Sequence, residues 1–141
     1  MQKKLENNPT FLFVVAAALI DLQGHILVQQ RPEGKNMAGL WGFPGGKVEA
    51  GESTATALAR ELKEELGISV VEGDLTPATF ASEPLDGRHL ILLLYICKKW
   101  SGKVQNLESP DMAWLPLEDL YDLAMPPADV PLVEQLSKLL R

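Results

Sequence analysis

The sequence has a single cysteine, Cys97, and only two histidines, His25 and His89. One cysteine excludes an intramolecular disulfide framework and fits a reducing compartment. Two isolated histidines do not form a zinc-binding pattern, so we assign neither of them to a metal. Cys97 lies in the apolar run LILLLYICKKW, where we expect a small buried side chain.

Positive charge is also scarce. The chain has 13 lysines and arginines against 19 aspartates and glutamates, which gives a formal net charge of −6. Proteins that bind nucleic-acid polymers usually carry a basic surface, so we expect no such partner. An acidic protein that handles phosphates needs cations to offset the repulsion between like charges.

Long hydrophobic runs are absent, because the apolar run over residues 11–20 is too short to cross a membrane as a helix. The run resembles the core of a signal peptide, but Glu6 interrupts the basic leader and Asp21 follows at once. A buried strand is the better interpretation. We therefore expect a cytoplasmic protein without a membrane partner, with a flexible segment at residues 1–9 and one domain at residues 10–141.

Strand and helix patterns alternate along the rest of the chain. The expected strands are residues 11–21, 25–30, 41–43, 76–82, 89–98 and 111–115. Pro77 favours an edge position for the strand at 76–82, and the nearly continuous apolar run at 89–98 favours a central one. The expected helices are residues 53–66, 117–123 and 130–140. This order predicts an α/β fold in which a mixed sheet lies between helices.

The helix expected at 53–66 carries three glutamates on one side. Ser53 is a suitable N-cap, Gly67 a suitable stop, and the alanines and leucines at 55, 58, 59, 62 and 66 form an apolar stripe. Glu61, Glu64 and Glu65 lie within an arc of about 100° away from that stripe. One interpretation is a solvated charged face; another is a site for Mg²⁺, which prefers oxygen ligands.

Residues 46–68 follow the pattern G-x5-E-x7-R-E-L-x-E-E-x-G-I. This pattern resembles the complete Nudix box. The flanking segments LVQQRPEGKNMAGLWGFPGGKVEAGES and MPPADVPLVEQL are similar to those of MutT-type Nudix hydrolases. The resemblance implies a Nudix fold and an enzyme that cuts a nucleoside triphosphate to the monophosphate and pyrophosphate, using Mg²⁺ or Mn²⁺.

The resemblance also implies roles for the acidic residues. Glu61, Glu64 and Glu65 would bind the metal together with the carbonyl of Gly45, and Arg60 would orient the glutamates through charge-assisted hydrogen bonds. Glu52 would act in catalysis or tie the preceding loop to the helix. Glu108, six residues before Trp114, would be a further metal ligand, the base that activates water, or an ordinary loop residue.

Four residues are candidates for substrate contacts. Arg31 and Arg88 match phosphate-side arginines of the family, Phe43 would line the base pocket, and Asp129 stands where the base edge is read. Well-known members have asparagine at that last position, and an ionised aspartate only accepts hydrogen bonds. A second departure is Gly42, where LWEFPGG is the usual pattern and a glutamate is therefore missing.

The resemblance implies an enzyme that hydrolyses 8-oxo-dGTP in order to keep oxidised nucleotides out of DNA, and we expect it to be a monomer. A preference for CTP or a modified dCTP is the alternative substrate, which Asp129 allows. A module that binds a nucleotide without cutting it is the alternative from another class, although such modules often lose acidic residues of the box.

Overall fold

The computed structural model describes residues 11–35 and 37–140, and its larger sheet has the strand order β4-β1-β6-β5. β1 (Phe11–Leu19) lies parallel to β6 (Arg88–Cys97), in a register that pairs Phe11 with His89 and Leu19 with Cys97. β4 (Gly45–Lys47) and β5 (Leu75–Leu85) are antiparallel to their neighbours. The sheet is therefore mixed, as predicted.

The second sheet is antiparallel and has the order β3-β2-β7. Its strands are β2 (Ile26–Gln30), β3 (Trp41–Gly42) and β7 (Met112–Leu115). β1 and β2 belong to different sheets and are joined by a tight connection with one isolated bridge between Ile20 and Ile26. The expected single sheet is thus divided in two, because nothing in an apolar run specifies which strand it pairs with.

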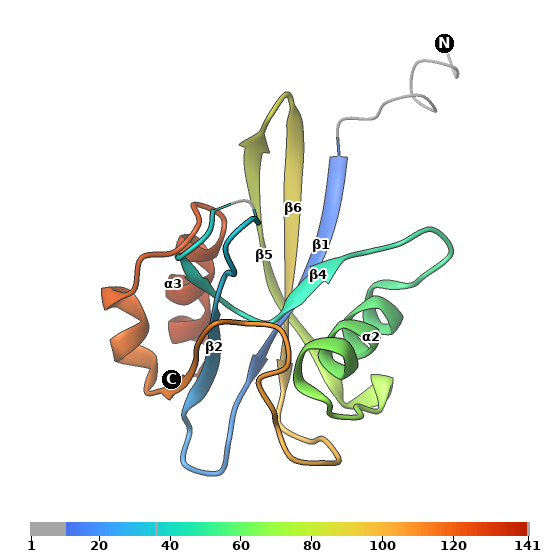
Figure 1. Cartoon of the computed structure of the whole chain (residues 1–141), viewed down its shortest axis with the longest axis vertical. Coiled ribbons are helices and arrows are strands. Elements are labelled where there is room, and N and C mark those ends of the chain that lie inside the picture. Colours follow the sequence, from blue (N-terminus) through green and yellow to red (C-terminus); the bar gives the residue numbers. More distant parts are fainter. Residues whose placement is uncertain (1–10, 36, 141) are drawn as a thin grey trace.

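The longer helices cover opposite sides of these sheets (Figure 1). α2 (Thr54–Leu66) packs on one side against Val15, Leu27 and their neighbours, and α3 (Asp129–Leu140) packs on the other against a cluster that contains Ile26 and Leu94. Two 3₁₀ helices, η1 (Glu72–Asp74) and η2 (Leu117–Asp122), complete the described elements. The predicted α/β class, with helices on both sides of the sheets, is confirmed.

Several local expectations are also confirmed. β5 is an edge strand with an irregularity between Pro77 and Thr79, because proline has no N–H for the ladder. Cys97 is fully buried, and burial raises the pKa of its thiol. No helix in the described ranges is long and apolar enough to cross a membrane. The flexible segment predicted at residues 1–9 lies outside the described residues.

Candidate active site

Helix α2 forms a fixed frame for the acidic residues. The Ser53 hydroxyl accepts a hydrogen bond from the Thr56 amide at 3.1 Å, and Gly67 ends the helix in the left-handed conformation at φ 71°. The apolar side is anchored by four fully buried residues, Ala57, Leu58, Leu62 and Leu66. Ala57 was not on the predicted stripe, and Ala55 and Ala59 are only half-buried. The opposite side of this anchored helix carries the glutamates.

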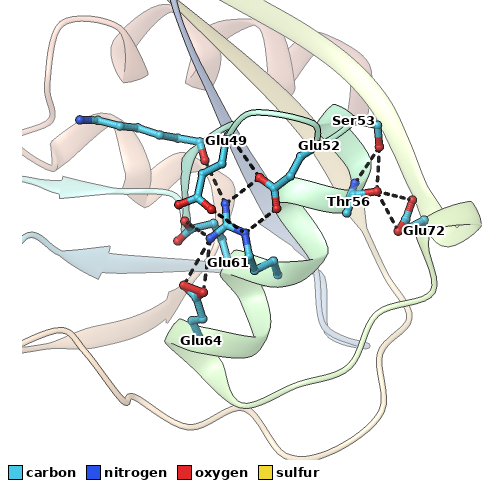
Figure 2. A network of polar contacts seen from close by, with 9 residues as sticks. Glu49, Glu52, Ser53, Thr56, Glu61, Glu64 and Glu72 are labelled. Atoms are coloured by element: carbon cyan, nitrogen blue, oxygen red, sulfur yellow. Dashed lines mark hydrogen bonds and ion pairs between the residues drawn. The ribbon is translucent and has the colours of Figure 1, made fainter.

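Arg60 joins the carboxylates of the Nudix box into one network (Figure 2). Its guanidinium donates to both oxygens of Glu52, from Nε at 2.6 Å and from Nη2 at 2.9 Å. Nη1 donates to Oε2 of Glu61 at 2.9 Å and to Oε1 of Glu64 at 3.3 Å. Nη2 also donates to the Lys47 carbonyl at 3.1 Å. The Arg60 guanidinium therefore holds three carboxylates and the loop that contains Lys47 in place. These hydrogen bonds raise the pKa of Arg60, and the bond to Glu52 contributes most.

Glu61 lies directly against the backbone of Gly46. A Cβ atom at position 46 would come within 2.5 Å of Oε2 and 2.6 Å of Oε1 of Glu61. Glycine is therefore required at position 46 for this carboxyl to reach the β4 strand. The closeness of β4 and α2 brings the loop before the helix and the helix itself to the same site.

Glu65 is a half-buried acid of the same helix side. Its Oε1 accepts a hydrogen bond from the Gly45 amide at 3.2 Å. Burial raises the pKa of the Glu65 carboxyl, and a hydrogen bond with Glu61 and the charge of Glu108 raise it further. The exposed loop residue Glu108 is thus electrostatically close to Glu65, in keeping with its predicted place in the site.

Asp129 lies at the start of α3, against the backbone of β3. A Cβ atom at Gly42 would overlap Oδ2 of Asp129, so Gly42 leaves the space that this carboxyl occupies. Asp129 is buried, and burial raises its pKa to about 7 although the charge of Arg31 opposes this. The structure therefore brings Asp129, a candidate for substrate contacts, against Gly42, the other departure from the family pattern, and within reach of the charge of Arg31.

Phe43 and Arg88 lie in different surroundings. Phe43 is half-buried and packs against the cluster under α3. Arg88 is exposed at the end of the β5–β6 hairpin, which projects beyond the sheets in Figure 1. Within the described residues, no hydrogen bond or ion pair joins Arg88 to the other candidates. A substrate role for these two residues stays a prediction.

The NUDIX domain model matches residues 10–136 of this chain. The chain belongs to the Nudix hydrolase family. It is 38% identical over 125 residues to the CTP pyrophosphohydrolase of Escherichia coli K12, covering 89% of this chain and 91% of that protein. It is 32% identical over 114 residues to the 8-oxo-dGTP diphosphatase of the same organism, covering 81% and 87%. The solution structure of the E. coli ORF135 protein superposes with a TM-score of 0.81 at 37% identity, covering 92% and 91%.

The carboxylates of this Nudix site suit a hard divalent cation. The candidate side-chain ligands are all carboxylate groups, and the nearby Glu61 adds to the burial that raises the pKa of Glu65. A divalent cation among these carboxylates would offset the repulsion between their charges. Glu64 is turned to Arg60, and no three acidic, histidine or cysteine side chains in residues 11–35 and 37–140 converge as they stand. A metal that used all three glutamates would draw Glu64 away from Arg60.

Sequence reasoning missed two groups at this site. The Lys47 carbonyl binds Arg60, and a backbone acceptor leaves no trace in residue identity. Gln29 is a buried glutamine in β2 that pairs with Gly42, and it reads in the sequence as the ordinary end of a strand. Recognising it required the strand register.

Proposed function

We propose that the protein is a Mg²⁺-dependent nucleoside triphosphate pyrophosphohydrolase. The observation that carries this proposal is the placement of Glu52, Glu61 and Glu64 on one guanidinium, beside the half-buried Glu65. Mg²⁺, when bound, would neutralise part of the triphosphate charge. Mn²⁺ is the alternative cation, since it accepts the same oxygen ligands. Glu61, Glu64 and Glu65 would hold the ion, with the Gly45 carbonyl as a further ligand.

The reaction is a displacement by water at a phosphorus of the triphosphate chain. The water oxygen forms a bond to phosphorus, the bridging P–O bond breaks, and the products are the nucleoside monophosphate and pyrophosphate. Glu61 or Glu108 would accept the proton of the water. Arg31 would stabilise phosphate charge from the side of Asp129, and Arg88 would do so from the β5–β6 hairpin.

Oxidised purine triphosphates, with 8-oxo-dGTP as the first candidate, suit the base side of this site. With a pKa near 7, Asp129 is protonated in a large share of molecules at neutral pH. A protonated carboxyl donates and accepts, as the asparagine of the family does. Phe43 would cover one side of the base. This activity would remove damaged nucleotides from the cytoplasmic pool.

CTP or a modified dCTP is the second candidate. The 38% identity to a CTP pyrophosphohydrolase favours it. An ionised Asp129 would accept a hydrogen bond from the amino group of cytosine. A non-catalytic module is disfavoured because every acid of the box is present.

A panel of triphosphates tests the proposal. Pyrophosphate release is measured for 8-oxo-dGTP, dGTP, dCTP and CTP, with Mg²⁺, with Mn²⁺ and with a chelator. We expect metal-dependent release from one class of base at a rate well above the others. Binding without release from any triphosphate would overturn the enzymatic proposal.

A further inference from the structure

Gln29 has a buried polar group with nothing to bind. Its residue is 7% exposed, and its side-chain nitrogen Nε2 has no hydrogen-bond partner in the part of the chain that the structure describes. Leaving a buried amide donor unpaired is unfavourable, and buried polar groups in folded proteins almost always have partners. A donor kept in this state is explained when a bound molecule supplies the acceptor.

The strand register directs this donor towards Asp129. Gln29 in β2 pairs directly with Gly42 in β3. Directly paired residues of antiparallel strands point to the same face, with Cβ atoms about 5 Å apart. Gly42 has no side chain, and the space beside it is taken by the carboxyl of Asp129. The amide of Gln29 and the carboxyl of Asp129 therefore flank the same bare backbone.

The Asp129 carboxyl faces the same place. Its residue is 8% exposed, and its Oδ2 occupies the space beside Gly42. The Asp129 backbone amide donates to the Pro126 carbonyl, and the charge of Arg31 acts on the carboxyl. An unpaired amide donor and a buried carboxyl from separate elements thus flank the backbone of Gly42.

We propose that Gln29 is a specificity-determining residue, which donates from its side-chain nitrogen to an acceptor on the base while Asp129 binds the neighbouring donor of the same base edge. This inference rests on the proposed function for the presence of a nucleotide. The matching ligands are bases with an acceptor beside a donor, such as N3 and the amino group of cytosine, or O6 and N7–H of 8-oxoguanine.

The same geometry explains the missing glutamate at position 42. Any side chain at that position meets Asp129, so a glutamate and the observed Asp129 position exclude one another. Gln29 supplies a polar group from the facing strand instead.

The test uses the full-length protein and three variants. Gln29→Met keeps the length of the side chain and removes its hydrogen bonds, and Gln29→Glu replaces the donor by an acceptor. Gln30→Met is the matched control, because Gln30 is the next residue, points to the other face of the strand and donates to the Gly39 carbonyl. The binding probes are CMP, dCMP and 8-oxo-dGMP, with ribose 5-phosphate as the probe without a base, measured by titration calorimetry.

We expect Gln29→Met to weaken the best-bound nucleotide by about tenfold, the effect of one lost hydrogen bond to the base. Gln29→Glu should weaken it further, and both should leave ribose 5-phosphate binding unchanged. Gln30→Met should change neither the binding of the nucleotides nor that of ribose 5-phosphate. The midpoint of thermal unfolding of Gln29→Met should equal or exceed that of the parent protein, because the variant removes an unpaired buried amide.

Equal weakening of all four probes, or no change of any, would overturn the role of Gln29. A protein whose nucleotide binding depends on Gln29 but which releases no pyrophosphate would contradict the proposed function alone. A parent protein that binds none of the three nucleotides would contradict both.

Discussion

Glu52 and Arg60 form a two-pronged ion pair between the loop before α2 and the helix itself, with N–O distances of 2.6 Å and 2.9 Å. The hydrogen bond from Arg60 is the main cause that lowers the pKa of Glu52, and the Glu49 amide adds to it. Glu52 therefore stays ionised in the folded protein. The geometry favours the loop-tying role of Glu52 over a direct part in the chemistry.

Glu52→Gln should lower kcat/KM by about 10- to 100-fold, the usual effect of losing a residue that orients metal ligands. The amide keeps the shape but loses the charge, so Arg60 moves freely between Glu61 and Glu64. Steady-state pyrophosphate release at saturating Mg²⁺ measures the loss. Glu49→Gln is the control, since Glu49 is exposed and lies 3.8 Å from Arg60. An equal loss in both variants would argue against the special role of Glu52.

Glu64→Gln should abolish turnover and leave the fold intact. Glu64 is exposed and contacts Arg60 at 3.3 Å, so its removal costs little stability, whereas the metal would lose a negative ligand. Activity is measured over a Mg²⁺ titration, with circular dichroism as the check on folding. Glu118→Gln, at an exposed acid of η2, should keep full activity. Full activity of Glu64→Gln would show that the metal assignment is wrong.

Gly46→Ala should separate the glutamate cluster from β4. The added methyl group meets Oε2 of Glu61 at 2.5 Å, so the carboxyl must rotate away. We expect kcat to fall by about 100-fold, as for the loss of one precisely placed polar group, with a loss of about 1 kcal/mol in unfolding free energy. Gly73→Ala is the matched control, because a Cβ atom at Gly73 has nothing within 4 Å. Similar kinetics of the two variants would contradict the close approach.

Asp129→Asn should change how stability depends on pH. The folded-state pKa of about 7 lies above the ordinary value of 3.8, so the folded protein binds the proton more tightly than the unfolded chain. The contribution of Asp129 to stability is then greatest below pH 4 and is lost as pH rises towards and through 7. Relative to the asparagine variant, the parent protein should lose up to about 4 kcal/mol over this interval.

Urea unfolding at pH values from about 4 to about 9 provides the measurement for Asp129. The variant is the control for the parent protein, because an asparagine at position 129 cannot titrate. The difference between the two proteins should become constant above pH 8. Parallel curves across the whole interval would mean that the Asp129 carboxyl is solvated rather than buried.

Helix α2 could be predicted because its signals are local. Ser53 caps it, Gly67 ends it, and its leucines repeat at helical spacing, so the predicted span of 53–66 differs from Thr54–Leu66 by one residue. Glu61, Glu64, Glu65 and Arg60 lie in consecutive turns of the helix, and this spacing predicts that their side chains lie close together. The acidic part of the site was readable from spacing for this reason.

Contacts between segments that are distant in the sequence could not be predicted from such local signals. Division into two sheets depends on which strand lies beside β1 and β2, and the residue pattern of a strand does not specify its neighbour. The Asp129 carboxyl meets Gly42 only after α3 has packed on the sheets, and Gln29 gains its meaning only from the β2–β3 register. Sequence patterns carry no information on such pairings unless the turn between the strands is short.

The parallel pairing of β1 with β6 has a consequence for how the protein is made. β1 pairs along its whole length with a strand that ends at Cys97, so the central ladder cannot form until that residue has left the ribosome. Until then the apolar residues of β1 have only the three-residue β4 as a partner in this sheet. The nascent chain therefore exposes an apolar segment through most of its synthesis. We expect chaperones to bind this segment during translation rather than in the folded enzyme.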